Sequence, residues 1–228
     1  MTNSMKVSIV ILAYNEEKYI RKCLESIAKQ IEKPDEVIIV DNNCTDNTVE
    51  IARQYGARIV KEEKQGMIYA RNAGFNNAKF EILGRLDADT VVPENWVAKV
   101  KENFQDQSIV ALSGPISIGT PISYFASILI FKLLSIFILH NALFGPNIGL
   151  RKSAWENIKN DVCLKDKDVH EDVDLAIHVA AQGKIKFDKK LIMKASRFRY
   201  KAFFTEYIVR YIKMVFTHRK IIFQIYPD

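Results

Sequence analysis

The chain has 228 residues, of which 48% are hydrophobic and 26% charged, so it is neither a disordered segment nor a small disulfide-dependent fold. Its formal net charge of +6 is divided unevenly, with +9 on residues 184–228 and −3 on residues 1–183. Because the basic excess is confined to one end and no nucleic-acid-binding motif occurs, we expect no nucleic-acid partner.

The first 115 residues alternate short β-branched stretches with helical patterns, as is typical of an α/β fold with a mostly parallel, Rossmann-like sheet flanked by helices. Predicted strands cover residues 7–12, 36–41, 57–61, 80–86 and 109–113. Predicted helices cover residues 16–29, 46–55, 66–77, 93–104 and 172–182. We expect Asn15 to be the N-cap of the first helix and Pro93 to lie in the first turn of the fourth.

In a sheet of this kind the ligand binds at the carboxyl ends of the strands. The first predicted strand is followed by Ala13-Tyr14-Asn15-Glu16-Glu17, the second ends at Asp41 before an Asn-rich turn, and the fourth is followed by Asp87-Ala88-Asp89. The glycine motifs of dinucleotide-binding and P-loop proteins occur nowhere in the chain. Two strand ends therefore direct carboxylates toward one crevice.

Asp87 and Asp89 are the central chemical feature of the sequence. Two carboxylates at positions i and i+2 of a strand-ending turn can share Mg²⁺ or Mn²⁺, which would neutralise a bound diphosphate. The structural alternative is that Asp89 or Thr90 only caps the helix that begins at Pro93. Asp41 taken alone is ordinary turn chemistry.

Three scattered cysteines, Cys23, Cys44 and Cys163, form no Cys-x-x-Cys pair, and no histidine stands at metal-ligand spacing from them. This usage predicts a reduced, cytoplasmic chain. The first twelve residues have neither the apolar run nor the small-residue cleavage site of a signal peptide. We therefore expect the catalytic part to stay inside the cell.

Six segments together resemble family 2 glycosyltransferases, which have the GT-A fold. They are residues 7–17, residues 36–46, Ala-Arg-Asn-Ala-Gly at 70–74, Leu-Asp-Ala-Asp at 86–89, Gly-Pro-Asn-Ile-Gly-Leu-Arg at 145–151 and His-Glu-Asp-Val-Asp-Leu at 170–175. Their order and spacing cover residues 6–195. The resemblance implies transfer of a sugar from a nucleoside diphosphate sugar.

The resemblance also implies a nucleotide-sugar site formed by Ala13, Tyr14, Glu16, Asp41, Arg71, Asp87 and Asp89. Tyr14 would lie against the base, whose N–H edge suits the acceptor-only carboxylate of Asp41. Arg71 would lie near the diphosphate, where its forked guanidinium can bind phosphate oxygens. Asp87 would lie near the ribose or sugar, and Asp89, with Asp87, would bind the Mg²⁺ or Mn²⁺.

Glu171 and Asp172 begin the helix predicted at residues 172–182. An isolated acidic pair in a first helical turn usually means only capping. In the family that this chain resembles, the matching pair faces the acceptor and its second member is the general base, which favours Asp172, with Glu171 next. His170 receives no catalytic role. The implied reaction is one in-line displacement that inverts the anomeric carbon.

Three departures from the family pattern change the expectation. Asn42 stands where many relatives have a second Asp, so the nucleotide contact there loses a charge. No Gln-x-x-Arg-Trp motif follows the acidic pair, which disfavours a processive polymerase. Ser196 stands where relatives have a metal-binding His, so no third protein ligand for the metal is identified.

Two stretches have the composition of surfaces that contact a membrane or an acceptor. Residues 124–139 form an apolar run interrupted by Lys132, shorter than the ~20 residues that a spanning helix needs. It is either a core helix or an interfacial segment beside the acceptor. Residues 198–225 place aromatic and basic side chains at helical spacing, which suits an anionic membrane surface or a helix packed on the catalytic domain.

We therefore predict a GT-A catalytic domain at residues 1–197, with a nucleotide-sugar-binding half (1–115) and an acceptor-binding half (116–197), followed by a basic amphipathic C-terminal helix at 198–228. The predicted activity is inverting, metal-dependent, non-processive glycosyl transfer from a donor, with UDP favoured, to a saccharide or polyprenyl-linked acceptor in cell-envelope glycan synthesis. The predicted location is peripheral, at the cytoplasmic face of the membrane. The alternatives are a sugar-phosphate nucleotidyltransferase and a non-catalytic membrane-associated nucleotide-sugar-binding module.

Overall fold

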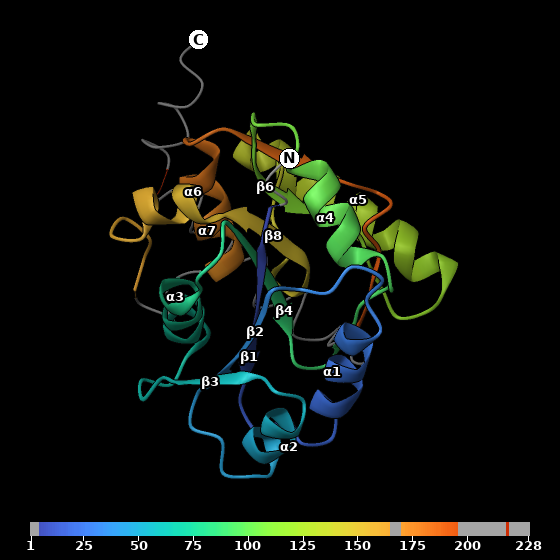
Figure 1. Cartoon of the computed structure of the whole chain (residues 1–228). Coiled ribbons are helices and arrows are strands. Elements are labelled where there is room, and N and C mark those ends of the chain that lie inside the picture. Colours follow the sequence, from blue (N-terminus) through green and yellow to red (C-terminus); the bar gives the residue numbers. More distant parts are fainter. Residues whose placement is uncertain (1–4, 165–169, 196–217, 219–228) are drawn as a thin grey trace.

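The computed structural model describes residues 5–164, 170–195 and 218 (Figure 1). The predicted C-terminal helix at 198–228 and Ser196 lie outside the described residues, apart from His218. Within the described part, seven strands form one sheet in the order β3-β2-β1-β4-β8-β6-β9. They are β1 (Val7–Ala13), β2 (Glu36–Asp41), β3 (Arg58–Lys61), β4 (Ile82–Asp87), β6 (Ile109–Ser113), β8 (Ile148–Arg151) and β9 (Lys184–Phe187).

The sheet is mostly parallel, as predicted, and joins the two predicted halves of the domain. Strands β1 to β4 pair in parallel, β9 is parallel to β6, and β8 runs antiparallel between β4 and β6. Since β8 and β9 lie within residues 116–197, this segment completes the sheet that residues 1–115 begin. A second, three-stranded sheet contains β5 (Thr90–Val91), β10 (Met193–Ala195) and β7 (Ile116–Ser117).

Helices cover both faces of the large sheet because successive strand side chains point to opposite sides. In β1, Ile9 and Ile11 enter one core, whereas Val10 enters the other. The first core is covered by α1 (Ile20–Ala28), α2 (Thr48–Gln54) and α4 (Trp96–Asn103). The second is covered by α3 (Met67–Asn77), α5 (Pro121–Ile138), α6 (Lys152–Ile158) and α7 (Glu171–Ala180).

Two predicted helix starts are wrong. α1 begins at Ile20 after Tyr19, and Asn15 instead adopts a left-handed conformation with φ 54°, its side chain accepting from the Thr45 N–H. α4 begins at Trp96, three residues beyond Pro93. The Pro93 carbonyl accepts hydrogen bonds from the Trp96 N–H and the Gln30 side chain, so a turn precedes the helix.

The apolar run at residues 124–139 lies in α5, and only one side of this helix is buried. Phe131 and Ile138 enter the core, with the Phe131 ring stacked on Phe187 at 3.7 Å. The opposite side exposes five large apolar residues at helical spacing: Ile122, Phe125, Leu129, Leu133 and Ile136, each 49–82% exposed. None of the helices in the described part of the chain has the length and apolarity needed to span a bilayer.

At the amino end of β2, Glu36 connects three strands through its carboxylate. It accepts hydrogen bonds from Arg58 at 2.8 and 3.0 Å, from the Ser8 hydroxyl at 2.8 Å and from the Lys79 N–H at 3.1 Å. Burial alone would raise its pKa, but these donors overcome burial and lower the pKa below its ordinary value.

Replacing Glu36 with Gln is expected to lower the free energy of unfolding by about 1–3 kcal/mol at neutral pH, because a buried charge-assisted network is lost. A carboxyl with a lower pKa in the folded state stabilises the fold above its unfolded-state pKa, and this stabilisation is lost as the pH falls through the folded-state pKa. The difference between Glu36→Gln and wild type, measured by urea unfolding, should therefore shrink in acid.

The control is Glu50→Gln, which removes an exposed partner 3.8 Å from Arg53 and should change stability little. A loss of unfolding free energy in Glu36→Gln that does not change with pH would contradict the stabilising role of the ionised Glu36 carboxylate.

Candidate active site

The carboxyl ends of three neighbouring strands bring the predicted donor-site residues together. Ala13 at the end of β1 stands opposite Asp41 at the end of β2, and Leu12 stands opposite Asp87 at the end of β4. The order β2-β1-β4 therefore places both carboxylates at one edge of the sheet.

The loops after β1 and β2 are hydrogen-bonded to each other. The Cys44 thiol donates to the Ala13 carbonyl at 3.4 Å, and the Glu16 N–H donates to the Thr48 hydroxyl at 2.8 Å. These bonds fix the backbone on both sides of Tyr14, whose side chain remains 51% exposed. An aromatic face is thus available beside Asp41 at the strand edge.

The side-chain amide of Asn42 holds the loop before α3 in place through three hydrogen bonds. Its side-chain NH₂ donates to the carbonyls of Glu62 and Lys64 at 3.0 and 2.7 Å, and its oxygen accepts from the Gly66 N–H at 2.8 Å. A carboxylate could not donate these two bonds. Asn at this position therefore holds the loop that leads into α3.

Asp87 lies at the end of β4 in a crowded acidic environment. Its carboxylate is 3.2 Å from Arg85, and burial, opposed by Arg85 but reinforced by Asp172 and Asp89, raises its pKa to about 6. The alternative that Asp89 or Thr90 caps the next helix is not observed, since α4 begins after Asn95 without a side-chain cap. The Thr90 hydroxyl instead donates to the Asp87 carbonyl.

Arg85 is the centre of a buried ion cluster that the sequence did not identify. It lies in the middle of β4 with no exposed surface, and its guanidinium contacts Glu171, Asp172 at 2.6 Å and Asp87. Arg71 of α3 donates to the Glu171 carboxylate at 2.9 Å and to the Glu171 carbonyl at 3.0 Å. The acidic pair at the start of α7 therefore binds arginines, which is more than helix capping.

The two members of the acidic pair are in different electrostatic states. Burial raises the pKa of Glu171, and the neighbouring Asp172 carboxylate adds to this effect. Burial would also raise the pKa of Asp172, but Arg85 and the Gly145 N–H, 2.9 Å from Asp172 Oδ2, hold it well below its usual range. Asp172 is therefore the member that stays ionised at neutral pH.

Comparison with known proteins agrees with this architecture. Residues 8–154 match the model of the family described as glycosyl transferase family 2. The chain belongs to this family. Glycosyltransferase AglE of Haloferax volcanii is 31% identical over 130 residues, which cover 53% of this chain and 43% of AglE. Glycosyltransferase GlyG of Streptococcus pneumoniae is 32% identical over 114 residues, 47% of this chain and 38% of GlyG. The chain thus matches less than half the length of these relatives.

Solved structures show the same fold. The mannosyltransferase PcManGT from Pyrobaculum calidifontis, in complex with GDP-Man and Mn²⁺, has a TM-score of 0.75 at 19% identity over 95% of this chain and 65% of that one. TarS 1–349 of S. aureus, in complex with UDP-GlcNAc, has a TM-score of 0.66 at 24% identity over 86% and 59%. The predicted GT-A fold is therefore confirmed.

In this family 2 chain, Arg71, which the resemblance places near a diphosphate, contacts the acidic pair. Its side chain is fully buried, its guanidinium donates to Glu171 and Asn72, and it lies 5.7 Å from the ring of Trp155. Arg71 is thus an ion-pair partner of Glu171. A role in phosphate binding stays a prediction, whereas contact with Glu171 is observed.

The sequence contains an indication, not used in the comparison of motifs, that Arg85 forms a buried ion pair. An arginine inside the apolar strand at residues 80–86 must find carboxylate partners, because an unpaired buried charge is strongly destabilising. Which carboxylates it meets depends on the packing of α7 against β4, which the sequence does not specify.

Gly145 is expected to be required for the contact between Arg85 and Asp172. A Cβ atom at this position would lie 2.2 Å from Arg85 Nη1 and 2.7 Å from Asp172 Oδ1, so the ion pair would have to move. Gly145→Ala should reduce turnover by at least about tenfold and lower stability by about 1–3 kcal/mol. Donor-hydrolysis assays and thermal unfolding measure the two effects.

The control is Gly149→Ala, whose Cβ would press on the Phe104 ring at 3.0 Å and meet no ionised group. It should lose stability but keep most of its turnover. Equal turnover in the two variants would show that the ion pair does not depend on Gly145.

Proposed function

We propose that this chain is an inverting, metal-dependent, non-processive glycosyltransferase that moves a sugar from a nucleoside diphosphate sugar to an acceptor hydroxyl. The observation that carries the proposal is that Asp87 and Asp172 both form ion pairs with the guanidinium of Arg85. Asp87 at the donor edge of the sheet is 3.2 Å from Arg85, and Asp172 at the start of α7 is 2.6 Å from it. A donor-side carboxylate and a candidate base thus belong to one cluster.

The residues present fit a divalent cation at the donor edge. Asp87 and Asp89 offer carboxylate oxygens, which are the ligands that Mg²⁺ and Mn²⁺ prefer. Burial is the main cause of the raised pKa of Asp87, and the nearby Asp172 and Asp89 carboxylates raise it further, so a bound cation would favour the ionised form of this carboxyl. When bound, the cation would supply charge neutralisation for the departing diphosphate.

For the donor, we infer a nucleotide whose base lies against Tyr14 and donates to Asp41. UDP is the favoured nucleotide, as in the UDP-GlcNAc complex of TarS and the UDP complex of glucosyl-3-phosphoglycerate synthase from Mycobacterium tuberculosis. PcManGT, in complex with GDP-Man, supports GDP as the next candidate. Ala13 and Glu16 would complete the contacts along the loop after β1.

Asp172 is the proposed general base. Because Arg85 and the Gly145 N–H hold its pKa low, Asp172 is ionised at neutral pH, and it would accept the proton of an acceptor hydroxyl that becomes acidic as its oxygen attacks the anomeric carbon. Glu171, held by Arg71 and Arg85, would position α7 and Asp172 relative to the donor. One displacement of this kind inverts the anomeric configuration.

For the acceptor, we propose a saccharide or polyprenyl-linked glycan reached at a membrane surface, in cell-envelope glycan synthesis. The support is the exposed apolar side of α5, since large apolar side chains at helical spacing insert into the boundary between headgroups and acyl chains. The three cysteines are all free, which favours the cytoplasmic face.

The test of the proposed function is calorimetric titration of UDP and GDP with and without Mn²⁺, together with transfer or hydrolysis of UDP-sugars. We expect Mn²⁺-dependent binding in wild type. Asp172→Asn should lower turnover by about 10²–10⁴-fold because the proton acceptor is removed, while nucleotide affinity stays nearly unchanged.

Binding that is absent or independent of Mn²⁺ would contradict the metal-dependent reaction. Loss of nucleotide affinity in Asp172→Asn, with unchanged thermal unfolding, would contradict the assignment of Asp172 as base.

Flotation with phosphatidylglycerol-containing vesicles tests the membrane contact. Phe125→Ser combined with Leu129→Ser should reduce the vesicle-bound fraction at least about threefold, because two inserted side chains are lost. The matched control is Ile31→Ser, which removes an apolar side chain of similar exposure, 76%, from another part of the surface. An equal reduction of the vesicle-bound fraction in both variants would contradict insertion of α5 into the membrane surface.

A further inference from the structure

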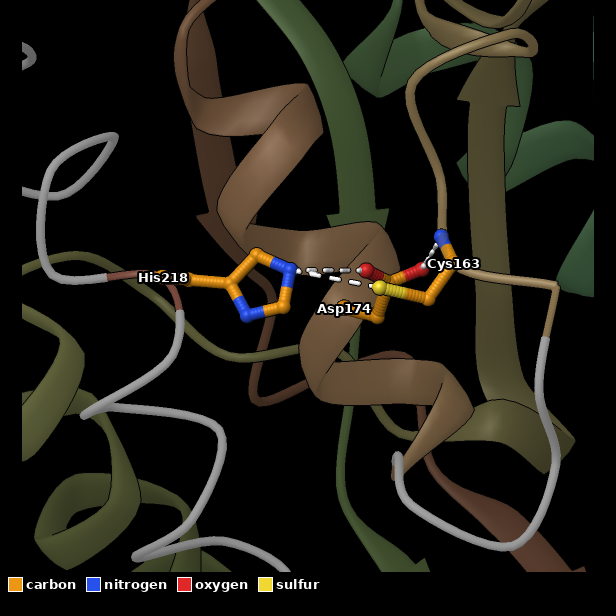
Figure 2. Close-up of side chains that lie close together, drawn as sticks. All are labelled: Cys163, Asp174 and His218. Carbon is orange, nitrogen blue, oxygen red and sulfur yellow. Dashed lines mark hydrogen bonds and ion pairs between the residues drawn. The ribbon is translucent and has the colours of Figure 1, made fainter.

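A second cluster of chemistry-bearing side chains lies on the other side of α7 from the proposed base. Asp172 and Asp174 are two residues apart, so at about 100° per residue they point to nearly opposite sides of the helix. Asp174 is fully buried, Cys163 comes from the segment after α6, and His218 is the one described residue beyond 195. Figure 2 shows the three side chains directed toward one another.

The three potential ligand atoms converge closely. Cys163 Sγ is 3.4 Å from His218 Nε2, and His218 Nε2 is 3.4 Å from Asp174 Oδ1. All three atoms lie within 4.8 Å of one another. The other Asp174 oxygen accepts from the Cys163 N–H at 3.1 Å, which fixes the carboxylate in this orientation.

A hydrogen-bonded Cys-His-Asp relay does not explain this geometry. In such a relay the sulfur and the carboxylate contact different nitrogens of the imidazole ring. Here both are 3.4 Å from the same nitrogen, Nε2, and one N–H cannot point along both directions. Three donor atoms that converge from three segments are the arrangement of a metal-binding site.

The distances agree with a tetrahedral ion. With metal–sulfur bonds of about 2.3 Å and metal–nitrogen or metal–oxygen bonds of about 2.0–2.2 Å, the corners of a tetrahedron are about 3.3–3.6 Å apart. The sulfur–nitrogen and nitrogen–oxygen distances are both 3.4 Å. Two of the three distances between ligand atoms therefore already match a tetrahedral ion, and the third is no longer than 4.8 Å.

Asp174 provides an independent indication that this set can bind a cation. Its Oδ1 atom is buried and accepts no hydrogen bond from the described residues, which is costly for a carboxylate oxygen. His178 Nε2 is 3.9 Å away, but its hydrogen bond goes to the Asp161 carbonyl.

We propose that Cys163, Asp174 and His218 bind a zinc ion. A thiolate, an imidazole and a carboxylate form a borderline-soft donor set that favours Zn²⁺ over Mg²⁺ or Mn²⁺, and a fourth position is left for water. Binding breaks the Cys163 S–H bond, forms a metal–thiolate bond and releases the proton to solvent. This site is distinct from the oxygen ligands at Asp87 and Asp89.

Such an ion would join the segment after α6, the first turns of α7 and His218. Since α7 also carries Glu171 and Asp172, the ion would fix the helix that positions the proposed base. Burial raises the pKa of the Cys163 thiol to about 11, so without a metal this thiol stays protonated at neutral pH. A coordinating thiol is deprotonated by the ion itself.

The test is the zinc content of the full chain after incubation with zinc and removal of excess metal, measured by mass spectrometry. We expect about one zinc ion per wild-type chain and at least about a tenfold lower content in Cys163→Ser and His218→Asn. Replacement by Co²⁺ should give a thiolate-to-cobalt absorption band in wild type that is absent in Cys163→Ser.

The matched control is Cys44→Ser, because Cys44 is half-buried like Cys163 and burial raises its pKa to about 11 as well. It should retain zinc and the cobalt band. Wild type that binds no zinc, or equal zinc contents in Cys163→Ser and Cys44→Ser, would overturn the proposal. These readouts do not involve sugar transfer, so they are independent of the proposed function.

Discussion

The buried guanidinium of Arg85 is the constraint on which the rest of the site depends. It comes from the middle of β4, and with no exposed surface it requires carboxylate partners. Asp87 supplies one from the same strand, and Glu171 and Asp172 supply two from α7. The strand β4 and the helix α7 are therefore joined through one cation. The distance between them at this point is set by directional, charge-assisted hydrogen bonds.

The charges of this cluster do not balance. Arg71 and Arg85 face the carboxylates of Asp87, Glu171 and Asp172, so full ionisation leaves negative charge in excess. The pKa values of Asp87 and Glu171 are raised, first by burial and then by the neighbouring carboxylates, while Arg85 holds that of Asp172 down. Ionisation of the donor-side carboxylate is thus coupled to that of the proposed base. A further cation at the donor edge would relieve the excess.

The sequence predicted the parallel strands and the polar residues at their ends, because both depend on local pattern. It failed where a distant contact decides the outcome. The Pro93 carbonyl accepts from Gln30, which lies far away in sequence, as well as from the Trp96 N–H, and α4 starts later than the local signal predicts. Likewise, the motif containing Arg71 was found, but its contact with Glu171 spans a hundred residues. The spacing of Cys163 gave no sign of His218, since only the fold brings them together.

The orientation of α7 follows from contacts on both of its sides. Its residues from Glu171 to Val179 are all buried, and Val173, Leu175 and Ile177 pack into the core. Apolar packing alone tolerates small rotations of a helix about its axis, whereas hydrogen-bonded charges are directional. Asp172 is directed to Arg85 on one side and Asp174 to the cysteine and histidine on the other, so any rotation weakens at least one set. The direction in which Asp172 points is therefore determined as much by the far side of the helix as by the cluster around Arg85.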